Sequence, residues 1–190
     1  MRLFVGVLPP RRARDELARA LRPHQGAWPG LRWIDRANWH VTLSFLGEVP
    51  EEIQPELETR LARAASRHAP MTLSLAGAGA FPSARRARVF WTGLYGPRLP
   101  LVRLAESLGA GARRAGAVQV DRKRLSPHLT LARTRTETDV TGLVEAFAAF
   151  EGAEWEMSAV HLVRSHLGST VRYEEIAEYA LTAPAPYGRS

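Results

Sequence analysis

Cysteine is absent from this sequence, and lysine occurs only once, at Lys123. Without cysteine the chain has no disulfide framework, no thiolate nucleophile and no thiolate metal site. No apolar run approaches the roughly 18 residues that a membrane-spanning helix requires. The opening residues MRLFVGVLPP have too short an apolar stretch for a signal peptide and instead predict a first strand. We therefore expect a cytoplasmic protein that does not interact with a membrane.

Arginine supplies nearly all of the positive charge, which gives a net charge of +7 and a sequence pI of about 10.8. Such a surface is either simply solvated, on a protein of arginine-rich composition, or attracts a polyanion. Charge alone leaves these two interpretations equally open. The 45% of hydrophobic residues is enough for an ordinary buried core.

Hydrophobic periodicity predicts strands and helices that alternate along the chain. One face of the first helix carries Ala13, Leu17 and Leu21, whereas Gly109 and Gly111 are expected to weaken the third helix. This mixed order favours an α+β or α/β fold with two related halves. The expected strands cover residues 2–8, 40–47, 71–81, 87–94 and 128–134, the expected helices 9–21, 50–68, 100–116 and 139–150, and the expected closing hairpin 155–165 with 171–181.

A short polar motif stands at the start of the predicted strand HVTLSFLG, residues 40–47. Side chains alternate between the two faces of a strand. An apolar face is explained by the core, but a titratable imidazole beside a hydroxyl on the other face is not. The expected polar face holds His40, Thr42 and Ser44, and the expected core face holds Val41, Leu43 and Phe45.

The same motif recurs in HLTLART, which begins at His128. His128 lies 88 residues after His40, a separation of nearly half the chain. His128 and Thr130 are expected to share one face with Ala132. Each copy follows a polar segment that contains Asp-Arg, IDRANW before the first and VDRKRLSP before the second. The repeat predicts a pseudo-symmetric protein in which each lobe presents one His-x-Thr strand.

Two such strands that face each other would bring two imidazoles and two hydroxyls to one place. Displacement at phosphorus needs a base on the attacking oxygen and an acid on the leaving oxygen. Histidine suits both roles because its pKa lies near neutrality. Threonine hydroxyls can donate hydrogen bonds to the non-bridging phosphate oxygens. Chemistry of this kind requires no metal.

The sequence resembles the 2H phosphoesterase superfamily, and in particular its RNA 2′,3′-cyclic phosphodiesterases, which are also called 2′-5′ RNA ligases. The resemblance spans essentially the whole chain and is carried by RLFVGVLPP, NWHVTLSFLGEV, RVFWTGL, SPHLTLART and LVRSHLGSTVRY. It implies one two-lobed α+β domain over residues 1–190. Each lobe is expected to have an antiparallel sheet and helices, and the two lobes are expected to flank a central groove.

The resemblance also implies a reaction and a set of site residues. RNA 2′,3′-cyclic phosphate ends would be hydrolysed to 2′-phosphomonoesters without metal or cofactor, and RNA ends would be joined 2′-5′ without ATP. Following the family's scheme, His40 is the proton donor and His128 the proton acceptor, although the sequence does not distinguish these roles. Thr42 and Thr130 complete the catalytic set, and Arg133 would bind substrate. The expected partners are RNA ends, including tRNA fragments, and the expected state is a monomer.

Several residues near these motifs have simpler interpretations. Arg133 would face away from Thr130 if the strand stayed regular, so a role at the rim competes with phosphate binding. His161 and His166 lie five residues apart on a predicted strand, hence on opposite faces, which disfavours a metal pair. The hairpin residues Ser165, Arg172 and Tyr173 lie where the hairpin could border the groove, but charged or hydroxyl residues in such places are more often simply exposed.

Three other functions compete with this prediction. A 2H enzyme could act on a small cyclic nucleotide, in which case a deep, closed pocket is expected rather than an open basic groove. The chain could also be a non-catalytic RNA-binding module, whose histidines could be replaced without loss of turnover. A metal-dependent hydrolase is disfavoured, because no carboxylate or cysteine lies near the histidines at ligand spacing.

Overall fold

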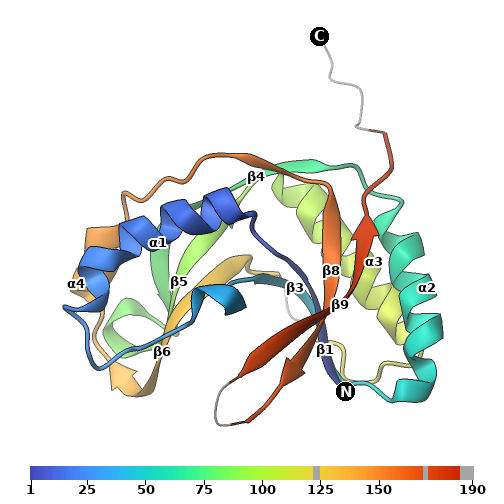
Figure 1. The fold of residues 1–190 in the computed structure, drawn as a ribbon, viewed down its shortest axis with the longest axis horizontal. Coiled ribbons are helices and arrows are strands. Elements are labelled where there is room, and N and C mark those ends of the chain that lie inside the picture. The colour runs from blue at the N-terminus through green and yellow to red at the C-terminus, as the bar shows by residue number, and fades with distance from the viewer. Residues whose placement is uncertain (122–124, 169–170, 185–190) are drawn as a thin grey trace.

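A curled antiparallel sheet with helices on its outer side forms the fold (Figure 1). The computed structural model describes residues 1–121, 125–168 and 171–184. The fold is α+β, as predicted. In chain order the strands and α-helices are β1 (Arg2–Val7), α1 (Arg11–Gln25), β2 (Arg32–Trp33), β3 (Val41–Glu48), α2 (Gln54–Ala65), β4 (Met71–Phe81), β5 (Ala87–Tyr95), α3 (Arg98–Arg114), β6 (His128–Thr138), α4 (Thr141–Phe147), β7 (Trp155–Met157), β8 (Ala159–His166) and β9 (Arg172–Ala180).

The sheet consists of two four-stranded halves that share one central contact. Its strand order is β7-β4-β5-β6-β3-β1-β8-β9, and the short β2 pairs with β6. The halves meet where β3 and β6 pair antiparallel through Val41 and Leu129. Each half therefore contributes one His-x-Thr strand, and these two strands are neighbours in a single sheet. The lobes are not consecutive halves of the chain, because β1 and β3 join with the late strands β8 and β9.

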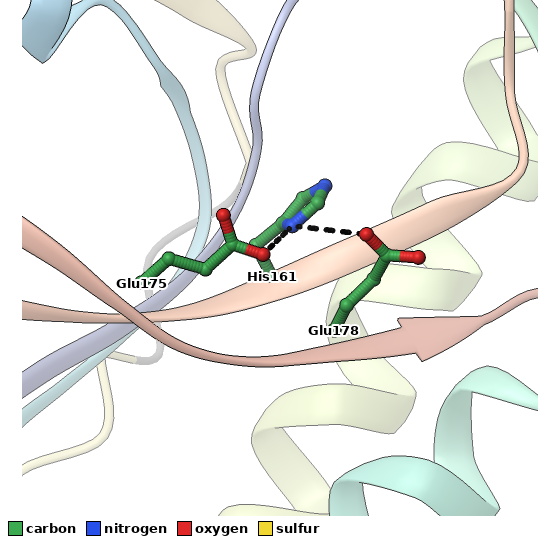
Figure 2. Close-up of side chains that lie close together, drawn as sticks. All are labelled: His161, Glu175 and Glu178. Atoms are coloured by element: carbon green, nitrogen blue, oxygen red, sulfur yellow. Dashed lines mark hydrogen bonds and ion pairs between the residues drawn. The ribbon is translucent and has the colours of Figure 1, made fainter.

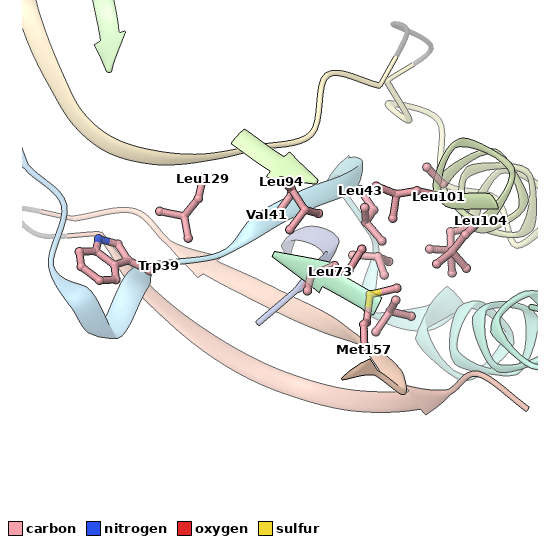
Figure 3. Packing of buried hydrophobic residues seen from close by; sticks show 14 of the residues in the cluster. Trp39, Val41, Leu43, Leu73, Leu94, Leu101, Leu104, Leu129 and Met157 are labelled. Atoms are coloured by element: carbon pink, nitrogen blue, oxygen red, sulfur yellow. The ribbon is translucent and has the colours of Figure 1, made fainter. Parts of the chain in front are cut away.

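The helices divide between the two lobes (Figure 1). Helices α1 and α4 contact β4, whereas α3 contacts β3 and α2 contacts β9. The core lies between the sheet and these helices, and Figure 3 shows Val41, Leu43 and Leu129 among its buried side chains. Val41 and Leu129 are fully buried. The residue that follows each motif histidine is thus anchored in the core, which fixes the backbone beside the imidazole.

Helix positions follow the predicted periodicity, and the third helix is more regular than expected. Ala13, Leu17 and Leu21 are buried on one face of α1. Helix α3 continues through Gly109 and Gly111, both of which are buried. A Cβ at Gly111 would lie 3.2 Å from the Arg60 carbonyl oxygen, so glycine allows α2 and α3 to approach closely. None of the helices that the structure describes is long and apolar enough to span a membrane.

The closing hairpin is confirmed only in part. Strands β8 and β9 pair antiparallel from Ala159 to His166 and from Arg172 to Ala180. The preceding residues Trp155–Met157 form the separate strand β7, which pairs with β4 in the other lobe. The expected strand 155–165 is therefore wrong as a single element, because residues 155–157 pair with β4 whereas the residues from Ala159 onward pair with β9.

Candidate active site

The register of the central strand pair brings the two motifs together. Val41 is opposite Leu129 in an antiparallel pair. Extended by one residue to each side, this register sets His40 across from Thr130 and Thr42 across from His128. All four side chains point away from the buried Val41 and Leu129. They line one cavity of about 130 Å³, together with the predicted Arg133 and three further residues, Ile34, Asn38 and Tyr173.

Both histidines are held by the same local contact. The Nδ1 atom of His40 lies 2.8 Å from the carbonyl oxygen of Asn38, and Nδ1 of His128 lies 2.6 Å from the carbonyl oxygen of Ser126. A carbonyl oxygen only accepts, so each Nδ1 carries a hydrogen and donates. The Nε2 atom of each neutral ring is then the free acceptor, and it is the atom available for proton transfer.

Aromatic side chains pack against each imidazole. The rings of Phe4 and Tyr173 lie 4.5 and 4.7 Å from His40, measured between centroids. The rings of Phe81 and Trp91 lie 4.9 and 6.0 Å from His128. Such neighbours limit the rotation of each ring and exclude water from one side of it.

Burial lowers the pKa of both imidazoles below the ordinary value of 6.5. Burial outweighs the carbonyl oxygens of Asn38 and Ser126, which act to raise the two pKa values. The Arg133 guanidinium lowers the pKa of both imidazoles further, because a nearby cation disfavours a second positive charge. Both rings are therefore mainly neutral at pH 7, and a bound anion is needed to favour the protonated form of one of them.

A β-bulge brings Arg133 into the cavity. On β5, Trp91 is opposite Thr130 and Phe90 is opposite Ala132, so β6 contains one extra residue between these pairs. An extra residue reverses the alternation of faces beyond it. Arg133 consequently shares the face of Thr130 and lines the cavity. The expectation that Arg133 faces away was conditional on a regular strand, and the bulge in β6 removes that condition.

A second bulge, in β3, changes which face Ser44 and Phe45 occupy compared with the prediction. Gly6 of β1 is opposite Thr42, whereas Val5 is opposite Ser44, so the alternation changes after Thr42. Ser44 is buried, and a Cβ at Gly109 of α3 would lie 3.3 Å from its hydroxyl oxygen. Phe45 is only half-buried. Ser44 therefore belongs to the helix-covered side, and the predicted faces beyond Leu43 are wrong.

The two bulges occupy matching places, but the residues after them differ. Phe45 follows Thr42 by three positions, as Arg133 follows Thr130. Phe45 carries no charge, and the Arg2 guanidinium lies over its ring at 4.9 Å from the centroid. The four motif residues are thus related by pseudo-two-fold symmetry, whereas Arg133 breaks that symmetry.

Three cavity residues, Ile34, Asn38 and Tyr173, were not assigned to the site from the sequence. Tyr173, for which exposure was favoured over a place at the groove, lines the cavity and packs edge-on against His40. Burial raises the pKa of its hydroxyl, so Tyr173 remains a neutral hydrogen-bond donor at pH 7. The side-chain amide of Asn38 donates to the carbonyl oxygen of Val171 at 3.0 Å, and the main-chain carbonyl oxygen of Asn38 accepts from His40. Asn38 therefore links the loop before β3 to the start of β9.

A neighbouring cavity of about 190 Å³ shares Asn38, His40 and Tyr173 with the first. Its other lining residues include Trp39 and Glu175. About 130 Å³ is room for roughly four water molecules at about 30 Å³ each, which suits a single small anion. The second cavity adds space beside the same histidine for a further part of a ligand.

One cluster of potential metal ligands occurs among the described residues, on β8 and β9 (Figure 2). Nδ1 of His161 lies 2.9 Å from a carboxylate oxygen of Glu175, to which it is hydrogen-bonded, and 3.9 Å from one of Glu178. His166 pairs separately with Glu174. The predicted separation of His161 and His166 is therefore correct, but the two glutamates around His161 were not anticipated. These three residues do not line the cavity that contains His40 and His128.

Comparison with known proteins gives a consistent match. Residues 7–91 and 96–173 match the family model described as LigT like Phosphoesterase. An RNA 2′,3′-cyclic phosphodiesterase of Escherichia coli is 32% identical over 182 residues, 95% of this chain and 97% of that protein. A relative of the same name from Geobacillus stearothermophilus is 29% identical over 189 residues, 98% of this chain. The chain spans 59% of the length of that second relative.

Solved structures agree with the sequence matches. TT0787 of Thermus thermophilus superposes with a TM-score of 0.81 at 30% identity, over 97% of this chain and all of that one. Escherichia coli LigT in complex with 3′-AMP superposes with a TM-score of 0.78 at 28% identity, over 96% of this chain and 98% of that one.

Proposed function

Because the chain belongs to the LigT-like phosphoesterase family, we propose that it hydrolyses RNA 2′,3′-cyclic phosphate ends to 2′-phosphomonoesters, with His40 and His128 as its acid and base. The observation that carries this proposal is the meeting of both His-x-Thr motifs in one cavity across the β3–β6 contact. The name of the relatives, RNA 2′,3′-cyclic phosphodiesterase, supports the choice of substrate.

In the proposed reaction, water attacks the phosphorus atom opposite the 3′-oxygen. The neutral Nε2 of His128 takes a proton from the water, and the new P–O bond forms while the bond to the 3′-oxygen breaks. The protonated Nε2 of His40 gives its proton to the leaving 3′-oxygen. Afterwards His128 is charged and His40 is neutral, and exchange with solvent restores the starting forms.

The symmetry of the site suits an in-line displacement, in which the attacking and leaving oxygens lie on opposite sides of phosphorus. Two imidazoles related by a pseudo-two-fold axis can approach the phosphate from opposite sides. Thr42 and Thr130 would donate to its non-bridging oxygens, where negative charge is concentrated. Arg133 would bind one of these oxygens from one side only, and so orient the ribose relative to the two histidines.

The roles of the two histidines can be tested with a modified leaving group. A cyclic phosphorothiolate with sulfur at the 3′ position needs no proton to leave. If His40 is the acid, His40→Ala should lose little activity on this substrate, whereas His128→Ala should lose as much as on the normal one. The opposite pattern would exchange the two roles.

The central experiment uses a short RNA that ends in a 2′,3′-cyclic phosphate, with EDTA present. The expected product is the 2′-phosphomonoester, identified by 31P NMR. A 3′-phosphate product would show that the 2′-oxygen leaves, against the proposed orientation. Binding without turnover would instead indicate an RNA-binding module.

Three further proposals rest on the family resemblance. Joining of RNA ends 2′-5′ is the same displacement with an RNA hydroxyl in place of water, and therefore needs no ATP. It can be sought in the same assay at high concentrations of RNA with a free 5′-hydroxyl. The tRNA-fragment substrate and the monomeric state stay predictions, open to competition assays and to size-exclusion chromatography with light scattering.

A further inference from the structure

A basic cavity lies between α2 and α3, on the side of the lobe away from the histidines. Its volume is about 510 Å³. Helix α3 contacts β3, and its Leu101 and Leu104 lie in the same buried cluster as Leu43 (Figure 3). Thr42 faces the opposite side and lines the catalytic cavity. We call this basic cavity the arginine cleft, and its arginines are Arg60, Arg63, Arg67, Arg103 and Arg114.

Helix periodicity places these arginines on facing surfaces. Positions 60, 63 and 67 are spaced by three and four residues along α2 and the turn after it, so they share one face. Positions 103 and 114 lie eleven residues apart on α3, close to three turns, and also share a face. Each surface turns toward the other helix, so the guanidinium groups gather from both sides.

The floor of the cleft is made of small side chains. Ala64, Ala110 and Gly111 line it, and His68 bonds through Nε2 to the Ser107 hydroxyl at 3.0 Å. The described residues that line the cleft include no Phe, Tyr or Trp and no large aliphatic side chain. Protein-binding hot spots are typically Trp, Tyr or Arg side chains seated in well-packed, desolvated pockets. The cleft offers only arginines of this group, and Arg63, Arg103 and Arg114 are exposed instead of packed. A protein partner is therefore disfavoured here, and so is stacking of nucleic-acid bases.

The positive charge of the cleft is largely unbalanced. Five of its eleven lining residues are arginine, and Glu106 is the only acid among them. Arg60 pairs with Glu56 at 2.6 Å. Within the part of the chain that the structure describes, Arg63, Arg103 and Arg114 form no ion pair and are exposed. Repulsion among these cations is relieved when an anion binds between them.

We propose that the arginine cleft binds the phosphate backbone of RNA at a second site, separate from the catalytic cavity and without reading the base sequence. Guanidinium groups match phosphate oxygens in bidentate geometry. Since the cleft and the histidines lie on opposite sides of β3, only an RNA long enough to pass around the lobe contacts both. The cleft thereby strengthens binding of long RNA and leaves short substrates unaffected. This inference rests on the proposed function for its choice of RNA as the anion.

The test compares two double variants that remove the same charge. The cleft variant is Arg63→Gln with Arg103→Gln, one from each helix. The control is Arg19→Gln with Arg22→Gln, which are exposed on α1 over the other lobe. Binding is measured by fluorescence anisotropy with a labelled 30-nucleotide single-stranded RNA that ends in a 3′-hydroxyl. This readout needs no turnover, so it remains informative even if the phosphodiesterase proposal fails.

Each phosphate contact with single-stranded nucleic acid adds about 0.7 to the slope of log K against log salt. At 50 mM salt, loss of two contacts corresponds to roughly 10- to 100-fold weaker binding. We expect this loss in the cleft variant, a salt slope smaller by about 1.4, and no matching change in the control. Equal losses in both variants would refute the proposal, because they would report net charge alone.

Two further measurements separate RNA from a small anion and exclude misfolding. One measurement asks whether tripolyphosphate still displaces the labelled RNA from the cleft variant. If tripolyphosphate no longer displaces the RNA but the variant binds RNA with normal affinity, the cleft is a small-anion site and the proposal is wrong. The KM for a cyclic-phosphate dinucleotide should be unchanged, while the KM for the long RNA rises. If the double variant does not fold by circular dichroism, Arg114→Gln serves in its place, and normal RNA affinity in that variant would overturn the proposal.

Discussion

Arg133 offers the sharpest test of the catalytic cavity, because it reaches the site only through a bulge. In Arg133→Gln the charge is removed while a similar side-chain length is kept. A hydrogen bond to a charged group contributes about 1.5–3 kcal/mol. At about 1.36 kcal/mol for each tenfold change in rate, kcat/KM at the optimum pH should fall about 10- to 150-fold.

The same substitution should move the pH profile in a definite direction. In the proposed mechanism the productive enzyme has one neutral and one protonated imidazole. We therefore expect kcat/KM to be bell-shaped in pH, with limbs that belong to the coupled pair. Burial and the Arg133 cation both lower the two pKa values. The optimum of the parent enzyme is therefore expected below pH 6.5. Without the cation each imidazole accepts a proton more readily, so both limbs should shift to higher pH.

The assay measures kcat/KM for a cyclic-phosphate dinucleotide between pH 4.5 and 9. The matched control is Arg135→Gln, two residues further along β6, where the arginine is exposed and does not line the cavity. It should leave both the rate and the profile nearly unchanged. An unshifted profile in Arg133→Gln, or a shift to lower pH, would show that the guanidinium does not act on the imidazoles as described.

The other predictions concern the motif residues and their surroundings. His40→Ala and His128→Ala should each lower kcat by about 10²- to 10⁴-fold and each remove one limb of the pH profile; a flat profile in the parent enzyme would contradict this. Thr42→Val and Thr130→Val should lower kcat/KM without moving the limbs, because hydroxyls do not titrate in this range. EDTA should leave hydrolysis unchanged, and loss of activity that Mg²⁺ or Zn²⁺ restores would refute a metal-independent site. Gly6→Ala should destabilise the fold by about 1–3 kcal/mol in a urea titration, because the new Cβ would lie 2.7 Å from a β3 carbonyl oxygen; unchanged stability would mean that β1 shifts freely.

Local sequence patterns were sufficient to predict the helices and strands that position the candidate site. The apolar residues of α1 recur every four positions, and this spacing predicts its buried face because helix periodicity is a property of the segment itself. The His-x-Thr strands were predicted on the same ground. Their 88-residue separation also indicated that two equivalent strands exist, one in each lobe.

Side-chain direction beyond a few residues could not be predicted, because a bulge depends on the partner strand. The alternation of β6 is regular up to Leu131, and only pairing with β5 shows where the extra residue lies. Ser44 was therefore assigned to the wrong face, and the face of Arg133 could be given only on the condition of a regular strand. Trp155–Met157 was likewise assigned to the wrong pairing, since the choice of β4 as its partner depends on the whole sheet.

The sequence by itself determined which residues are the candidates for the chemistry, because histidine and threonine recur together in two short segments. Only the tertiary structure decided which other residues join them. Tyr173 reaches His40 from a strand more than 130 positions later, and the arginine cleft combines two helices whose arginines are unremarkable one at a time. Such groupings depend on the packing of distant segments, and local periodicity carries no information about that packing.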